Sequence, residues 1–229
     1  MTSRPISRYI LLCISSLLLL QPAAWGQRQK PRISIEADTV PLISGGQIYF
    51  NLAGAVLWQV SSYGELEGGA RLNIRNKYFP TVEAGMGFCN KTDDGTDLRC
   101  KTSAPFIRLG CDYNFARDKA SGNRIYGGLR AGYTTFKYDL SGPSVIDPYW
   151  QGQQMDISLS KVSCNAYWAE FLFGLETKIW RNFHLGWTIR YKRRLHYKEY
   201  DLGNSYYLPG YGKNSDHLFT GTFNLVFDI

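Results

Sequence analysis

A period-two alternation of side-chain chemistry runs through most of the chain from residue 46 onward. The clearest example is the segment 183–192, in which the odd positions are large and apolar and the even positions are small, polar or basic. Because successive side chains of a β-strand point to opposite faces of the sheet, this segment predicts a strand with one apolar and one charged face. The pattern therefore predicts an all-β fold.

Eight segments are expected to form strands, and seven of them sort their side chains in this way. In the segment 79–90, for example, Val82 and Met86 share one face, whereas Glu83 and two glycines share the other. The first segment is the exception, because it is apolar on both sides. The eight segments are 46–59, 64–77, 79–90, 99–116, 124–138, 162–180, 183–197 and 216–229.

The first 26 residues have the features of a cleavable export signal. Two arginines precede an apolar stretch from Tyr9 to Leu20, and Ala24–Gly26 forms a small-x-small cleavage site. Residues 27–45 contain two prolines and read as a periplasmic lead-in to the barrel, which is expected to span 46–229. We therefore expect an exported protein with one all-β domain.

Charges of both signs lie in the middle of the predicted strands, on the face that also carries the glycines. They are Arg71, Glu83, Arg108, Asp112, Arg130, Glu170, Glu176 and Arg190. A soluble, lipocalin-like binding barrel would place the apolar face inside. That face holds more aromatic bulk than eight strands can enclose, because side chains just fill such an interior. We therefore expect an eight-stranded antiparallel transmembrane up-and-down β-barrel, with apolar side chains toward lipid and a network of paired charges in the lumen.

The connections between the predicted strands alternate between short and long. Long segments follow the third, fifth and seventh strands, which is typical of the external loops of outer-membrane barrels. Both chain termini are then expected on the periplasmic side. A lumen filled by charged side chains leaves no wide channel, so we expect function in the loops, at the rim or in lipid contact.

Aromatic residues are concentrated in the two longest of these loops. They are Tyr149, Trp150, Tyr206, Tyr207 and Tyr211, and prolines lie close to them. Exposed aromatic side chains in such loops are typical of a surface that binds a partner, such as another envelope protein. The alternative is that the loops fold on their own aromatic side chains and plug the barrel mouth.

Four cysteines remain after the export signal, without the spacing of a metal site. Cys89 and Cys100 lie symmetrically about Asp94-Gly95, a dipeptide favoured in two-residue hairpin loops. Pairing outward from that turn would set the two cysteines opposite each other. The sequence thus allows a disulfide between them, although they could equally remain thiols.

Basic residues are most dense near the outer end of the seventh strand. Lys192, Arg193, Arg194 and Lys198 could contact the phosphates of lipopolysaccharide, since Arg and Lys both suit phosphate. The alternative is a rim of solvated or lumen-paired charges. The net charge of +7 could also suggest nucleic acid, but most basic residues fall on the charged strand face or in loops. We therefore expect membrane lipid and not nucleic acid as a partner.

Some eight-stranded barrels are lipid A-modifying enzymes that use a histidine together with a serine or an acid. His196 has Glu199 and Asp201 nearby, but no spacing singles out a serine. We therefore expect that the protein is not an enzyme, and the sequence shows no cofactor motif.

Five runs of the chain resemble a Bacteroidota family of small outer-membrane β-barrel proteins without assigned function. The runs occupy 77–87, 101–115, 126–150, 168–192 and 209–214, so the resemblance covers roughly residues 46–229. It implies an outer-membrane location and brings no catalytic residues. The expected role is structural, or binding through the extracellular loops, and the alternative is a lipid A-modifying enzyme.

Overall fold

A computed structural model describes residues 41–229, apart from 94, 118–120, 147–153 and 201–202. The predicted export signal and most of the lead-in therefore lie outside the described residues. The elements are β1 (Ile43–Asn51), α2 (Leu52–Val60), β2 (Tyr63–Ile74), β3 (Tyr78–Thr92), β4 (Arg99–Asn114), β5 (Arg124–Ile146), β6 (Gln154–Trp180), β7 (Phe183–Tyr197), β8 (Tyr207–Leu208), β9 (Gly212–Lys213) and β10 (His217–Asp228). No helix among them has the length and apolar character needed to cross a membrane.

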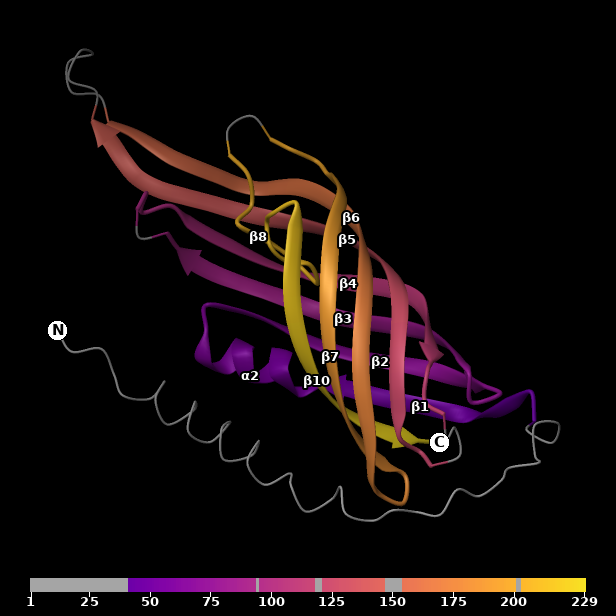
Figure 1. Ribbon diagram of the computed structural model, residues 1–229. Coiled ribbons are helices and arrows are strands. Elements are labelled where there is room, and N and C mark those ends of the chain that lie inside the picture. Colours follow the sequence, from indigo (N-terminus) through magenta and orange to yellow (C-terminus); the bar gives the residue numbers. More distant parts are fainter. Residues whose placement is uncertain (1–40, 94, 118–120, 147–153, 201–202) are drawn as a thin grey trace. The chain divides into compact units, whose positions relative to one another are not determined.

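Eight of the strands form a closed antiparallel ring in the order β1-β10-β7-β6-β5-β4-β3-β2 (Figure 1). Each strand pairs with its neighbours in the chain, and β1 closes the ring by pairing with both β10 and β2. β8 and β9 form a separate two-stranded hairpin. The predicted eight-stranded up-and-down barrel is confirmed.

The two faces of the barrel wall differ sharply in chemistry. On the outer face, Phe171, Trp187 and Phe219 are 57%, 56% and 70% exposed. On the inner face, Glu83 and Arg108 are completely buried. Since a water-soluble barrel would place these groups the other way round, this is the arrangement of a barrel that spans a lipid bilayer.

The apolar outer band is close in height to that of outer-membrane barrels. On β7 and β10 it runs from the Phe183–Phe227 pair to the Tyr191–Phe219 pair. This distance of eight residues corresponds to about 27 Å along the strand and, at a tilt of ~40°, to about 21 Å along the barrel axis. The known apolar band of such barrels is ~25 Å tall. The next outward pair on these strands, Arg193 and His217, is polar and marks the outer boundary.

Beyond that boundary the chemistry of the two faces is reversed. The outward residues of β4 and β5 become Lys101, Lys137 and other polar side chains, whereas inward residues such as Phe136 and Tyr138 are buried and apolar. A hydrophobic core forms here from Cys100, Ala104, Phe106, Phe136, Tyr138, Leu140, Cys164, Ala166, Trp168, Tyr197, Leu208 and Tyr211. β5 and β6 also extend past the other strands (Figure 1). The barrel therefore continues outside the membrane as a part with a water-soluble pattern.

The predicted first strand, 46–59, is only partly correct. The strand ends at Asn51, and the doubly apolar segment Leu52–Val60 forms the helix α2. The Asn51 side chain caps this helix by accepting a hydrogen bond from the Gly54 N–H at 3.3 Å. A segment that is apolar on both faces cannot alternate, whereas a helix satisfies its own backbone and can expose apolar side chains all round.

α2 replaces the continuation of β1 that would otherwise pair with β2 and β10 along their full length. β1 pairs with β10 only over residues 224–228 and with β2 only over residues 68–74. Outside these ranges, the described residues of β10 and β2 have ladder partners only in β7 and β3. Gly54 approaches β2 so closely that a Cβ there would lie 2.5 Å from the Glu65 carbonyl oxygen. The helix therefore packs tightly beside the edge of β2.

Candidate functional site

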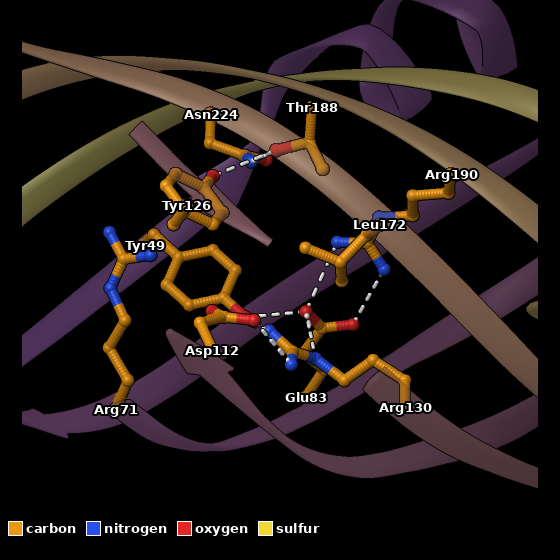
Figure 2. A pocket seen from close by; sticks show the side chains of 10 residues that line it. All are labelled: Tyr49, Arg71, Glu83, Asp112, Tyr126, Arg130, Leu172, Thr188, Arg190 and Asn224. Carbon is orange, nitrogen blue, oxygen red and sulfur yellow. Dashed lines mark hydrogen bonds and ion pairs between the residues drawn. The ribbon is translucent and has the colours of Figure 1, made fainter. Parts of the chain in front are cut away.

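The barrel lumen is filled by buried ion pairs, with Glu83 at the centre (Figure 2). Arg108 and Arg190 lie 2.9 Å and 2.8 Å from the Glu83 carboxylate, and Tyr49 donates a hydrogen bond to it at 2.6 Å. Arg130 lies 3.3 Å from Glu83 and forms a two-pronged pair with Asp112, at 2.7 Å and 2.8 Å. Opposite charges in direct contact offset the cost of burying each ion.

Two further groups of contacts extend this network toward both ends of the barrel. Toward the outside, Glu170 lies 3.0 Å from Arg108 and 3.3 Å from Arg190. Toward the end with the short turns, Arg71 pairs with Glu176, which lies 3.4 Å from His184. All eight predicted lumen charges are buried in the lumen, and each contacts at least one opposite charge.

Sequence reasoning missed further members of the network. Glu67 lies 2.8 Å from Arg108, and Arg124 lies beside Glu176. The strand alternation could have identified Glu67, because it shares a face with Arg71. It could also have placed Lys192 inside, since the inward residues of β7 are the even ones.

Little free volume remains between these side chains. The cavity around Glu83 and Arg130 has a volume of about 10 Å³. A water molecule needs ~10–15 Å³ in this measure, so this cavity holds about one. The lumen of the described barrel is therefore packed at this level.

The long loop after β7 folds back into the barrel mouth. Tyr207, Leu208 and Tyr211 are 2%, 0% and 0% exposed, so the segment Tyr207–Tyr211 is a plug. The Gly210 carbonyl oxygen accepts hydrogen bonds from Arg108 at 2.7 Å and from Lys192 at 2.8 Å. The plug therefore joins the outer end of the ion-pair network.

The predicted aromatic loop surface is largely wrong for the residues that the structure describes. The Tyr207 hydroxyl donates to the Gly64 carbonyl, and Tyr211 packs edge-on against Trp168, so neither can meet a partner. Burial raises the pKa of the Tyr207 hydroxyl well above its ordinary value. Tyr206 alone is half-exposed, and its hydroxyl accepts a hydrogen bond from Lys91. Tyr149 and Trp150 lie outside the described residues.

The predicted lipopolysaccharide contact is wrong for one of its four residues. Lys192 is buried, because its Nζ donates to carbonyls of the plug. Arg194 is held by an ion pair with Asp216 at 2.6 Å and lies over the Tyr197 ring. Arg193 and Lys198 are exposed at the outer rim.

The predicted pairing of Cys89 with Cys100 is also wrong. Cys89 lies opposite Thr102, and Cys100 lies opposite Lys91. The hairpin loop is four residues long, because the closing hydrogen bond runs from the Asp93 N–H to the Leu98 carbonyl. The register is therefore shifted by two residues, which keeps both side chains on the inner face. Both cysteines are buried free thiols.

The part of the barrel beyond the apolar band contains a small pocket between the β3–β4 hairpin and the long loop. Its volume is about 220 Å³, and Leu98, Cys100 and Leu140 form apolar walls. Lys91 and Tyr206 also line it. No group of three potential metal ligands occurs among the described residues.

His196 contacts an aromatic ring. Its ring stacks on Tyr167 at a centroid distance of 4.9 Å, on the outer surface of the barrel. Glu199 is exposed, and Asp201 lies outside the described residues.

Comparisons with known proteins concern the family and the fold. A family model described as Domain of unknown function (DUF6048) matches residues 6–228. Among solved structures, the Ail attachment invasion locus protein of Yersinia pestis, crystallised with a heparin analogue, has a TM-score of 0.36, shares 12% identity and covers 80% of this chain and 93% of its own. Acinetobacter baumannii CarO2 has a TM-score of 0.40, with 15% identity and coverage of 82% and 98%. No curated protein sequence matches the chain.

Proposed function

The chain belongs to the DUF6048 family, a domain of unknown function, and on this premise we propose that it is an outer-membrane barrel that binds a partner through its extracellular part. The observation that carries the proposal is the reversal of side-chain polarity above the apolar band. A barrel whose only role was to span the membrane would need no hydrophobic core outside the lipid. This protein instead carries the hydrophobic cluster around Phe136 and Tyr138 there.

The filled lumen supports the same role. The ion pairs around Glu83 and the buried plug leave space for about one water molecule at the centre. Passage of solutes through the barrel would require both to move. Recognition at the outside requires neither.

The outer membrane is the proposed location because closed β-barrels with an apolar band occur in that membrane. The predicted export signal at 1–26 agrees with this location. Another protein of the envelope is the proposed partner. The long β5–β6 hairpin is its proposed binding element, since it projects beyond the other strands.

The proposed role is not catalytic. A lipid-modifying enzyme would need a nucleophile or an acid beside His196, whereas the described partner of its ring is Tyr167. Replacing His196 by alanine should leave the lipid A mass spectrum of an expressing strain unchanged. A change in acylation would favour the enzyme instead.

Deletion of Gly142–Ser160 tests the binding role. Within this segment, residues 144–146 of β5 pair with residues 154–156 of β6, beyond the last β4 partner of β5 at Ser141. The shortened barrel should insert and keep its heat stability but lose proteins that crosslink to the full-length barrel on intact cells. A control variant with Gly95→Ala changes an exposed loop only. Equal recovery of partners by the shortened and full-length barrels would contradict the proposal.

A further inference from the structure

The outer surface of β6, β7 and β10 carries a cluster of nitrogen donors at the upper edge of the apolar band. Arg193 on β7 lies directly opposite His217 on β10, and both are exposed. On the other side of Arg193 is Ala169 of β6, which adds no charge. Two basic side chains thus face each other across the ladder with no acid between them.

A β-bulge adds a third nitrogen group to this surface. Tyr167 pairs with His196 and Trp168 pairs with Arg194, so Leu195 is an extra residue in β7. Because of this extra residue, the His196 side chain points to the outer face of the barrel. There its ring stacks on the Tyr167 ring, with the ring centroids 4.9 Å apart. Bulges commonly re-aim a side chain in this way. Arg193, His196 and His217 are called the rim cluster below.

The rim cluster differs from the arginines of the lumen and from Lys101 in the groups that face it. In the lumen, Arg108, Arg130 and Arg190 each contact at least one carboxylate. On the opposite wall, the exposed Lys101 lies directly across from Asp139. Among the described residues, none forms an ion pair or hydrogen bond with the side chain of Arg193 or His217, and the Ser215 hydroxyl donates only to the backbone carbonyl of His217. An arginine faces a histidine here with no carboxylate directly opposite either side chain, so the donors of both can bind an anion from outside the chain.

The position of the cluster identifies the kind of anion. The next outward-facing pair toward the apolar band is Tyr191 and Phe219. Their ring centroids are 4.9 Å apart, and Phe219 is 70% exposed. A ligand at this place would meet hydrocarbon below and nitrogen donors above. That combination fits a lipid whose phosphate lies at the membrane boundary.

We propose that the rim cluster binds a phosphate group of lipid A in the outer leaflet, with the acyl chains of that lipid along Tyr191 and Phe219. The arginine supplies a planar pair of donors to the phosphate oxygens, and each imidazole supplies an N–H. This inference rests on the proposed location in the outer membrane. It does not depend on a partner for the β5–β6 hairpin.

Native mass spectrometry of the purified barrel tests the proposal. The full chain in detergent would be titrated with bisphosphorylated lipid A, with dephosphorylated lipid A and with inorganic phosphate. We expect retention of the phosphorylated lipid and little of the other two. The double variant Arg193→Gln, His217→Gln should bind roughly ten- to a hundredfold more weakly, as expected for the loss of charge-assisted hydrogen bonds.

Matched variants separate this site from a general effect of charge. Lys101→Gln and Arg181→Gln each remove an exposed positive charge elsewhere and should leave lipid A binding unchanged. Arg193→Lys keeps the charge without the planar fork and should lose less affinity than Arg193→Gln. All variants should first show the wild-type circular dichroism spectrum.

Three results would overturn the proposal. They are equal binding of dephosphorylated lipid A, displacement of lipid A by an equal concentration of inorganic phosphate, and wild-type affinity of the double variant. The variant that lacks Gly142–Ser160 separates this proposal from the proposed function. It should keep its lipid A, so that loss of the partner and loss of the lipid site are distinguished.

Discussion

Glu83 holds three arginines from three different strands in the centre of the lumen. Arg108, Arg130 and Arg190 all lie within 3.3 Å of its carboxylate, and the hydroxyl of Tyr49 also donates to it. Each of these cations is buried, so none can be solvated by bulk water. This one carboxylate therefore offsets the burial of cations from three strands.

The first prediction concerns this carboxylate. Glu83→Gln keeps the shape of the side chain but leaves a buried excess of positive charge, which typically costs about 3–5 kcal/mol. Urea unfolding in detergent, followed by tryptophan fluorescence, should show a loss of that size. Glu199→Gln, at an exposed position, should change the free energy of unfolding by less than about 0.5 kcal/mol. An unchanged unfolding midpoint for Glu83→Gln would mean that the network contributes nothing.

Which side chains point into the lumen was predictable wherever strand alternation alone decides it. It places Glu83 and Arg190 inside, and the same rule, applied to even residues of β7, places Lys192 inside as well. The outer end of β7 was not predictable, because the bulge at Leu195 changes the parity there. No feature of the local sequence marks that extra residue. The contact of Arg194 with Asp216 depends on how the long loop returns to the barrel.

The plug is an element that depends on one glycine. Gly210 has a φ of +80°, and a Cβ at this position would lie 2.4 Å from Cγ of Phe106. Its carbonyl also accepts hydrogen bonds from Arg108 and Lys192. A side chain at this position is therefore excluded both by the backbone conformation and by the space available.

Gly210→Ala should release the plug without unfolding the barrel. Limited proteolysis of the reconstituted protein should then cut between residues 203 and 213, where the wild-type chain is protected. Gly95→Ala is the matched control, because the nearest atom to its Cβ is 3.7 Å away and the loop is exposed. Full protection of the Gly210→Ala loop would show that the plug tolerates the displacement.

Alkaline pH should release the same element. Burial raises the pKa of Tyr207 well above the ordinary value of ~10, so the docked plug keeps this hydroxyl protonated. The released plug would lose the proton near that ordinary value. Docking is therefore fully favourable below about pH 10 and weakens as the pH rises further. Proteolysis of the loop should increase above this pH, and Tyr207→Phe should shift the increase to higher pH.

α2 shows why one element differed from its prediction. The segment Leu52–Val60 is apolar at nearly every position, which fits a buried strand, a lipid-facing strand or a helix equally well. The Asn51 cap is visible in the sequence, but Asn is also common in turns. The tight contact of Gly54 with β2 favours the helix, and that contact exists only in the closed ring.

At the scale of the whole molecule, the same strands alternate apolar and polar side chains both in the membrane and outside it. Within the apolar band the barrel is apolar outside, and beyond it the same strands are polar outside and apolar inside. The rule that predicted the strands used the membrane pattern, so it ended the fifth strand at residue 138 and began the sixth at 162. The structure continues them to Ile146 and from Gln154, because hairpin pairing persists after the chemistry reverses. Ladder partners such as Leu140 and Leu159 carry this extension.

Two barriers in series close the lumen of the whole barrel, and this leads to the last prediction. The plug closes the outer mouth, and the ion pairs around Glu83 close the centre. In planar lipid bilayers the wild-type barrel should therefore show no steady ion conductance. Gly210→Ala should show none either, because the ion pairs below the plug remain in contact. Conductance should appear only when the plug variant is combined with Arg190→Ser and Glu170→Ser, which remove a neighbouring cation and anion together. A steady current through the single plug variant would mean that the charge network is an open pore, because in that case the plug alone would have been the barrier.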